Sequence, residues 1–425
     1  MEYKKEIVEN AKIGEKYIRI KHPSGCKICL YPMKNYSTAY AIFGTNYGSV
    51  DTTFKTDSDK DFVTVPEGVA HYLEHKLFEN EDCDAFQKFA KTGAYANAFT
   101  TFDKTTYHFS CSHKFEENLE ILLSFVQEPY FTDETVAKEQ GIIGQEIDMY
   151  RDDPGWRVFF NCLQAVYHNN PVRIDIAGTA ESIKKIDKDL LYRCYNTFYN
   201  LNNMVLAIAG NFDVDKTLEI CDRLLKKSPD RKLEKIIPTE PYEVKEKSVT
   251  AKLPCAQPIF NIMYKFPNMT MEETERNNIV YNLMFETCLG RTSAFYTEMY
   301  EQGLINDSFN AGVFSGRGFF VGVVDGESKE PTIVKDRVNS QLKRLKTELP
   351  SREEFENIKK RNYGSMLMGY DYVSGVASAL LNCEMNGLSL FNAINITAEI
   401  TYDDIVEALN KLDIDNCSIS VVEPT

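Results

Sequence analysis

The same order of elements occurs once in each half of this chain: a helix leads through an asparagine into an apolar strand. In the first half, the helix-like residues 189–199 precede Asn203 and the run NMVLAIAG. In the second half, the helix-like residues 402–412 precede Asn416 and the run CSISVV. An internal repeat of this kind is typical of two similar domains in tandem, and 425 residues are too many for one ordinary core.

A charged segment without an apolar period lies between the two halves. Residues 226–247 read KKSPDRKLEKIIPTEPYEVKEK and contain three prolines, which predicts an exposed linker. We therefore expect an N-terminal domain at 1–228, a linker at 229–247 and a C-terminal domain at 248–425. Strand-like and helix-like stretches alternate in the first half, and a second unit of the same kind is expected to follow the linker, which favours an α+β fold.

The composition of the chain excludes some classes of binding partner and indicates the cellular compartment. Asp and Glu number 63 against 48 Lys and Arg, for a net charge of -15, which argues against nucleic acid or an anionic membrane as the main partner. The N-terminal residues show no apolar stretch typical of a secretory signal, and no run is long enough to cross a bilayer. The eleven cysteines are scattered and odd in number, as is typical of reduced thiols. We expect a cytoplasmic protein.

The segment VPEGVAHYLEHKLFEN carries the main candidate site. On the helix that we expect there, His71, Glu74 and His75 stand at i, i+3 and i+4 and share one face. Two imidazoles can bind zinc and leave a coordination position open. Zinc acidifies a water molecule, and a carboxylate beside it can accept the proton and deliver it to the leaving nitrogen of an amide. The pattern indicates metal-dependent hydrolysis, although the same residues also meet on helices by chance.

A pair of carboxylates lies on a predicted long helix from about Asp133 to Asp152. Glu139 and Glu146 are seven residues apart in KEQGIIGQEIDMY, so both face the same way. One of them could bind the metal and the other could support the site. The alternative is a pair of solvated surface glutamates, which is the usual place for this residue.

Several segments together resemble the pitrilysin/insulin-degrading enzyme family of zinc peptidases, whose metal motif is H-x-x-E-H. They are GVAHYLEHKLFE, YANAFTTFDKTTYHF, EQGIIGQEIDMY, PVRIDIAGTAESI and NMVLAIAGNFD. The chain is most similar to bacterial half-length members related to the β subunit of the mitochondrial processing peptidase. The resemblance implies a zinc endopeptidase that cleaves peptides or unfolded segments. A dedicated peptide-processing protease and a non-catalytic structural subunit remain as alternatives.

The resemblance also implies roles for individual residues. Glu146 corresponds to the third zinc ligand of the family, and Glu139 corresponds to a glutamate that supports the site electrostatically. Asn97 and Ala98 match the Asn-Ala pair on a strand along which the substrate is expected to lie as an added antiparallel strand. Each half is expected to be an α/β roll of the LuxS/metallohydrolase kind, with an antiparallel-rich sheet and helices on one face.

One part of the family pattern is missing. Members complete their site with an arginine and a tyrosine in R-x-x-x-G-L-x-Y. With Gly303 and Leu304 as the anchor, Met299 stands at the arginine position and Asn306 at the tyrosine position. A donor aimed at the oxyanion of the intermediate contributes about 3 kcal/mol. We therefore expect a chain that is weakly active alone and that pairs with a zinc-free homologous subunit supplying both groups.

Overall fold

The structure is a computed structural model that describes residues 4–81 and 83–425, and it contains two compact units. The first unit takes the residues up to Gln145, Ile176–Ile236 and Leu367–Asn392, and the second takes Glu146–Asp175, Ile237–Met366 and Ala393–Thr425. The chain passes from the first unit to the second between Ile236 and Ile237, which lie within the linker predicted at 229–247. The units differ from the predicted domains 1–228 and 248–425 because each includes a helical segment from the opposite half of the chain.

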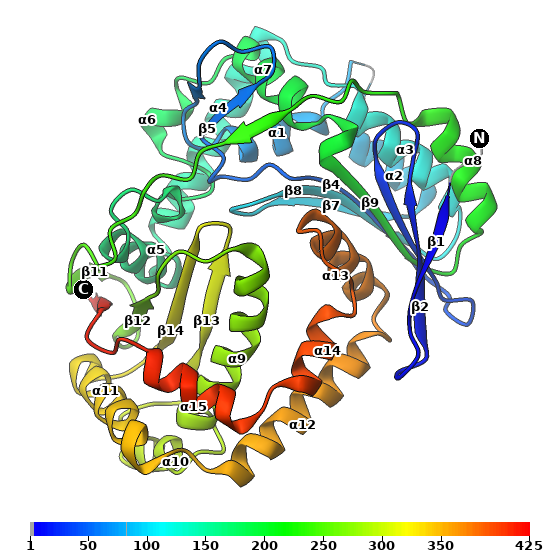
Figure 1. Cartoon of the computed structure of the whole chain (residues 1–425). Coiled ribbons are helices and arrows are strands. Elements are labelled where there is room, and N and C mark those ends of the chain that lie inside the picture. Colours follow the sequence, from blue (N-terminus) through cyan, green and yellow to red (C-terminus); the bar gives the residue numbers. More distant parts are fainter. Residues whose placement is uncertain (1–3, 82) are drawn as a thin grey trace. The chain divides into compact units, whose positions relative to one another are not determined.

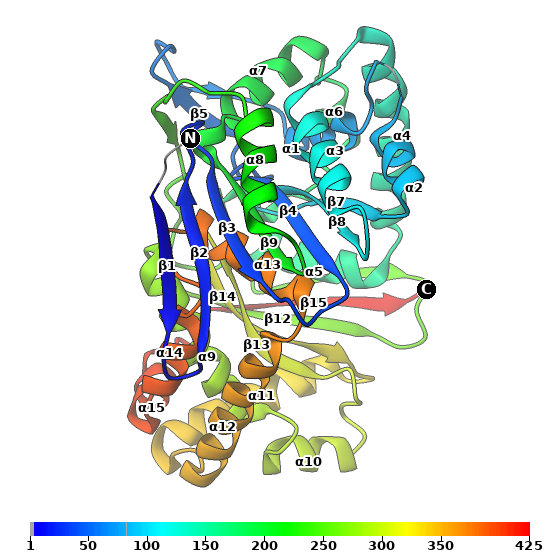
Figure 2. The same ribbon diagram turned by 90° about the vertical axis from the view of Figure 1, so that its right-hand side faces the viewer.

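The first unit is built on a seven-stranded sheet in the order β1-β2-β3-β9-β4-β8-β7. All neighbours are antiparallel except β3 and β9, which are parallel. Figure 2 shows β1, β2 and β3 side by side. The strands are β1 (Lys5–Asn10), β2 (Glu15–Lys21), β3 (Lys27–Pro32), β4 (Ala39–Thr45), β7 (Tyr95–Thr100), β8 (Thr105–Cys111) and β9 (Met204–Gly210), and a small second sheet contains β5 (Thr53–Thr56), β6 (Val63–Thr64) and β10 (Leu233–Lys235).

Helices cover both faces of the central strands of this sheet. On β4, Phe43 is buried and pairs with Tyr107, whose ring meets Phe125 of α3. The next residue, Gly44, faces the other way, and a Cβ there would lie 3.0 Å from Leu381 of α13. The helices of this unit are α1 (Val69–Leu77), α2 (Ala85–Thr92), α3 (Phe115–Gln127), most of α4 (Asp133–Arg151), α6 (Ala180–Ile183), α7 (Lys188–Phe198), α8 (Val214–Leu224) and α13 (Val373–Met385), with the 3₁₀ turn η2 (Leu201–Asn203).

The second unit is built on a five-stranded sheet in the order β11-β15-β12-β14-β13. One core joins its strands to α9, α11 and α15, and α9 lies alongside β13 (Figure 1). The elements are α5 (Pro154–Val166), η1 (Pro171–Arg173), β11 (Ser248–Leu253), β12 (Ile259–Lys265), α9 (Met271–Leu289), α10 (Ala294–Glu301), β13 (Asn310–Gly316), β14 (Phe319–Glu327), α11 (Pro331–Glu348), α12 (Arg352–Gly369), α14 (Asn392–Glu399), α15 (Tyr402–Lys411) and β15 (Cys417–Pro424).

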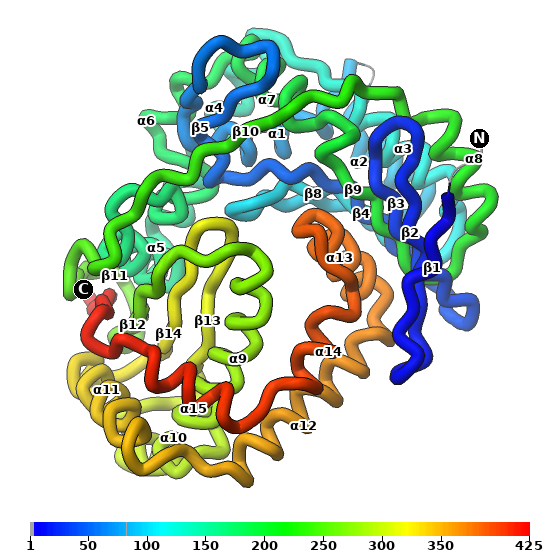
Figure 3. The backbone as a smooth tube through the Cα atoms, in the orientation of Figure 1, coloured from blue at the N-terminus to red at the C-terminus, as the bar shows by residue number. Residues whose placement is uncertain are grey.

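The repeat seen in the sequence has a counterpart in the two sheets. Strand β9 follows α7 and pairs parallel with β3 and antiparallel with β4. Strand β15, at the red end of the chain in Figure 3, follows α15 and pairs parallel with β11 and antiparallel with β12. The predicted α+β fold with two antiparallel-rich sheets is confirmed, with the addition that α13 covers part of the second face of the first sheet. Among the described residues, no helix is both long and apolar enough to span a bilayer.

Candidate metal centre

A glycine fixes where the motif helix α1 begins. Gly68 precedes the helix with φ of 90°, a conformation that side chains other than glycine adopt rarely. A Cβ at Gly68 would also lie 2.5 Å from the carbonyl oxygen of Ala177. The neighbouring Glu67 carbonyl accepts a hydrogen bond of 2.9 Å from the Ser182 hydroxyl. The start of α1 is thus held against the segment that precedes α6.

Helix α4 turns one face toward α1. Val136 and Ile143 are its buried residues, and they stand three residues before Glu139 and three before Glu146. Positions separated by three, four or seven residues share a helix face, so the two apolar side chains orient both glutamates inward. The Tyr72 hydroxyl of α1 donates to the Val136 carbonyl of α4 at 2.5 Å, which ties the two helices together.

The three predicted ligands converge at this place. Ligand atoms of His71, His75 and Glu146 all lie within 4.8 Å of one another, and the two imidazole rings are 4.6 Å apart between centroids. The division between the compact units falls between Gln145 and Glu146, but α4 runs through it without interruption, so the helix itself positions Glu146. This group of residues could hold a metal ion.

Glu139 contacts one of these histidines. Nδ1 of His75 donates to Oε1 of Glu139 at 2.9 Å, which leaves Nε2 as the ring nitrogen for a metal. Burial acts to raise the pKa of Glu139, but the hydrogen bond from His75 and the charges of Lys76 and Lys138 outweigh it and lower that pKa. A carboxylate behind a ligand histidine fixes its tautomer and ring orientation, as is common in metal sites.

Glu74 contacts the strand that carries Asn97. The hydroxyl of Thr100, the last residue of β7, donates to Oε2 of Glu74 at 2.8 Å. A cavity of about 640 Å³ lies here, and Glu74, His75, Glu139 and Asn97 are among the residues that line it. The structure thus brings the motif, both glutamates of α4 and β7 to one place.

Strand β7 lies at the edge of its sheet, next to β8. Its side chains alternate between exposed and half-buried positions. The side-chain oxygen of Asn97 accepts the backbone N–H of Ala98 at 2.9 Å. An edge strand with accessible backbone groups is a template for another extended chain.

Comparison with known proteins agrees with this geometry. Residues 64–180 match the family described as insulinase (peptidase family M16), and residues 185–362 match the peptidase M16 inactive domain. The chain is 37% identical over 409 residues to YmfH of Bacillus subtilis, an uncharacterised zinc protease, with 95% of each chain covered. The chain belongs to the insulinase family, M16.

Two further similar proteins match different shares of this chain. A crystal structure of an M16-like peptidase from Alicyclobacillus acidocaldarius superposes with a TM-score of 0.91 at 31% identity, over 100% of this chain and 99% of that one. The β subunit of the mitochondrial processing peptidase of Caenorhabditis elegans is 29% identical over 162 residues, which are 37% of this chain and 35% of that one.

The arginine and the tyrosine of the M16 pattern are replaced in this chain by Met299 and Asn306, and the structure shows what these two residues contact. Met299 is 1% exposed and belongs to the core of the second unit. Asn306 donates to Glu327 at 2.9 Å. Arg291, which precedes this segment and does not lie on the pattern, donates to the backbone carbonyl of Asp307.

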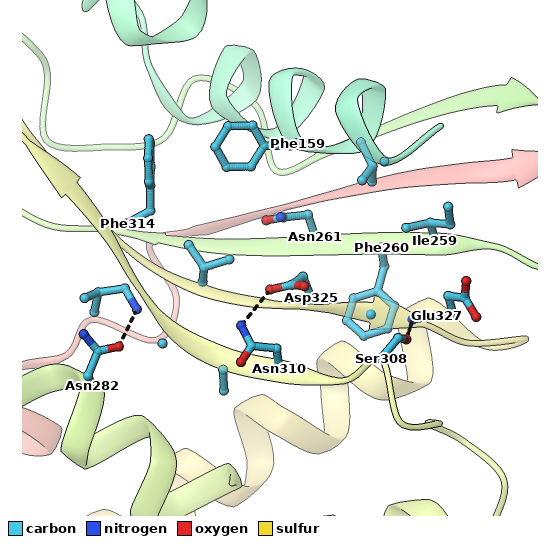
Figure 4. A pocket seen from close by; sticks show the side chains of 17 residues that line it. Phe159, Ile259, Phe260, Asn261, Asn282, Ser308, Asn310, Phe314, Asp325 and Glu327 are labelled. Atoms are coloured by element: carbon cyan, nitrogen blue, oxygen red, sulfur yellow. Dashed lines mark hydrogen bonds between the residues drawn. The ribbon is translucent and has the colours of Figure 1, made fainter. Parts of the chain in front are cut away.

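A second cavity, of about 500 Å³, lies within the second unit, between α5 and the sheet. Figure 4 shows Asn261, Asp325 and Asn310 in a row across β12, β14 and β13, with Phe159 of α5 above them. Burial raises the pKa of Asp325. None of the residues that the sequence assigned to the site is among those that line this cavity.

Thr100 is a further residue of this site, and the sequence alone gives it no role. The residue stands three positions after Asn97 in the segment quoted for its family resemblance, so the signal was present. Its contact with Glu74 depends on how the end of β7 meets α1, which only the fold shows.

Proposed function

We propose that this chain is the zinc-bearing catalytic subunit of a metalloendopeptidase that cleaves peptides or unfolded polypeptide segments. The observation that carries the proposal is the convergence of His71, His75 and Glu146, with Glu74 and Glu139 beside them. Two imidazoles and one carboxylate form a donor set that suits a catalytic zinc with an open position.

In the proposed site, His71, His75 and Glu146 would hold the zinc. Bound there, zinc supplies a Lewis acid that acidifies a water molecule and polarises the scissile carbonyl. Glu139 keeps the His75 ring oriented through Nδ1.

Glu74 moves the proton. It accepts a proton from the attacking water as the new C–O bond forms at the scissile carbonyl carbon. It then delivers that proton to the amide nitrogen as the C–N bond breaks. The products are a carboxyl group and a free amine, so atoms and charge balance without a further reactant.

The substrate is proposed to lie along the edge of β7. An extended peptide can form backbone hydrogen bonds with an exposed edge strand, and its side chains then make few specific contacts. Asn97 and Ala98 lie on this edge strand. Asn97 lines the same cavity as Glu74 and His75, so a peptide bound along β7 would lie next to the proposed catalytic residues. This arrangement favours unfolded segments over folded proteins.

The deciding experiment compares wild type with Glu74→Gln. The variant is expected to bind zinc in a one-to-one ratio, measured by metal analysis, and to lose cleavage of a peptide library by at least about 100-fold. Glu134→Gln, an exposed position on α4, serves as a control and should behave like wild type. Undiminished cleavage by Glu74→Gln would contradict the mechanism, and wild type without activity in any assembly would favour a structural subunit.

We propose that a zinc-free homologous subunit supplies the missing arginine and tyrosine. The proposal is supported by the side chains at the two pattern positions, since Met299 is buried and Asn306 is an amide bonded to Glu327. The chain alone and the chain mixed with candidate zinc-free homologues should differ in cleavage rate by at least about 100-fold, the effect of a single oxyanion donor. Full activity of a homogeneous homodimer would contradict this part of the proposal.

General degradation is favoured over processing of one dedicated substrate by the open backbone edge of β7. Peptides trapped by Glu74→Gln in a cell extract and identified by mass spectrometry should form a broad set. A single dominant species would indicate a processing enzyme instead. We place this activity in the cytoplasm, a reducing compartment that suits a chain with eleven scattered cysteines.

A further inference from the structure

Thr100 connects β7, the strand along which the substrate is proposed to lie, to Glu74, the proposed base. Its Oγ1 donates to Oε2 of Glu74 at 2.8 Å, while its backbone ends β7. Ala96, Ala98 and Thr100 alternate with Tyr95, Asn97 and Phe99 along the strand, so Thr100 points to the opposite face from Asn97. One strand therefore presents an edge for a peptide and, from its last residue, a hydroxyl for Glu74.

The turn that follows Thr100 is held at several points. The backbone N–H of Thr101 donates to the Lys104 carbonyl at 2.8 Å, and the Thr101 hydroxyl donates to Asp103 at 2.8 Å. From the segment after β4, the N–H groups of Ser49 and Val50 donate to the carbonyls of residues 101 and 102, each at 3.0 Å.

A glycine allows this close approach. A Cβ on Gly48 would lie 2.3 Å from the backbone nitrogen of Asp103 and 2.4 Å from the carbonyl carbon of Phe102. No side chain fits there unless the backbone moves. The turn is therefore clamped against the 48–50 segment, and the clamp fixes the end of β7 that carries Thr100.

We propose that Thr100 is a positioning residue for catalysis, which holds the carboxylate of Glu74 in the rotamer from which it accepts and returns the proton. This inference rests on the peptidase function proposed above and adds a specific residue to it. A glutamate side chain has several rotatable bonds, and proton transfer requires its carboxylate to lie within hydrogen-bond reach of the attacking water. One hydrogen bond from a clamped strand end selects that position and lowers the entropy lost on reaching the transition state.

Thr100→Val tests the proposal, because valine keeps the β-branched shape and replaces only the hydroxyl with a methyl group. In the assembly that is active for wild type, kcat is expected to fall by about 10- to 100-fold while KM changes less than about twofold. Thr100→Ser keeps the hydroxyl and should recover kcat to within about threefold of wild type. Zinc content and unfolding temperature should match wild type in both variants.

The matched control is Thr106→Val on the neighbouring strand β8. Thr106 is fully buried, and its hydroxyl has no hydrogen-bond partner among the described residues. The same chemical change there should leave kcat and KM as in wild type. Equal losses in Thr100→Val and Thr100→Ser, or an unchanged kcat in Thr100→Val, would overturn the proposal.

A structural readout separates this inference from the proposed function. Crystal structures of zinc-loaded wild type and Thr100→Val are expected to show the Glu74 carboxylate ordered in the first and displaced or disordered in the second. An unmoved Glu74 in the variant would refute the positioning role whatever the activity. An inactive wild type with a displaced Glu74 in the variant would instead refute the peptidase function and keep the contact.

Discussion

Nδ1 of His75 lies 2.9 Å from Oε1 of Glu139, and this contact joins the motif helix α1 to α4 at the candidate metal centre. The two residues are 64 positions apart in the chain, and each belongs to a pattern that the sequence shows separately. Their meeting gives Glu139 a specific task, because a carboxylate behind a ligand imidazole orients the ring and raises its basicity.

Replacing Glu139 should weaken metal binding before it affects the fold. Glu139→Leu removes the acceptor for His75, and we expect zinc affinity to fall about 10- to 100-fold, with Glu139→Gln nearer the lower end because its amide oxygen still accepts a hydrogen bond. Competition with a chromophoric chelator measures the affinity. The exposed Glu134→Gln on the same helix should bind zinc like wild type. Equal affinity in all three variants would show that Glu139 does not support His75.

Metal removal should lower the thermal stability of the chain. A metal that binds only the folded state at 100 times its dissociation constant adds about 2.7 kcal/mol, which corresponds to a loss of several degrees in Tm when a chelator removes it. Calorimetry with and without a chelator measures the shift. His71→Asn, which lacks a ligand, should show the lower Tm in both conditions and no shift between them. A chelator shift of equal size in this variant would mean that the metal binds elsewhere.

Tyr72 should contribute to the pairing of α1 and α4, the two helices that carry the candidate metal ligands. Its side chain is fully buried, and its hydroxyl donates to the Val136 carbonyl of α4. Tyr72→Phe removes one neutral hydrogen bond and is expected to lower the free energy of unfolding by about 1 kcal/mol. Urea unfolding measures the change, and Tyr300→Phe, at a side chain that is 48% exposed, should leave stability unchanged. A loss as large in Tyr300→Phe would show that the effect does not come from the α1–α4 contact.

Sequence reasoning worked best where one local signal fixes one element. The long helix was predicted from about Asp133 to Asp152, and α4 spans Asp133–Arg151. The metal motif was predicted as well, because helical spacing alone places His71 beside His75. Each of these predictions depends on residues that are neighbours in the chain.

Contacts between segments far apart in the chain could not be predicted from the local sequence pattern. Nothing in the local pattern around Val373–Met385 shows that α13 packs on the first sheet, since an apolar helix can cover either of two similar sheets. For the same reason continuous domains were expected, whereas the compact units exchange helical segments. The contact of Thr100 with Glu74 likewise depends on tertiary packing between a strand end and a helix.

A buried ion pair in the second unit gives the last prediction. Oε1 of Glu240 lies 2.8 Å from Nζ of Lys265, and the two side chains are 1% and 2% exposed. The carboxylate also accepts the backbone N–H groups of residues 168–170 at 2.7–2.9 Å. Burial acts to raise the pKa of Glu240, but the hydrogen bonds from Lys265 and from these N–H groups outweigh it and lower that pKa.

The sign of the pH dependence follows from this lowered pKa. An unfolded glutamate titrates near pH 4.3, so the stabilisation is complete above that pH and is lost as the pH falls through the lower folded-state value. Glu240→Gln leaves Lys265 buried without its counter-charge and should cost about 3–5 kcal/mol at pH 7. Urea midpoints measured from pH 7 to pH 3 should show the gap between wild type and variant narrowing as the pH falls. Glu407→Gln, at an exposed i,i+4 pair with Lys411, is the matched control, and a gap that is constant with pH would mean that folding does not lower the pKa of Glu240.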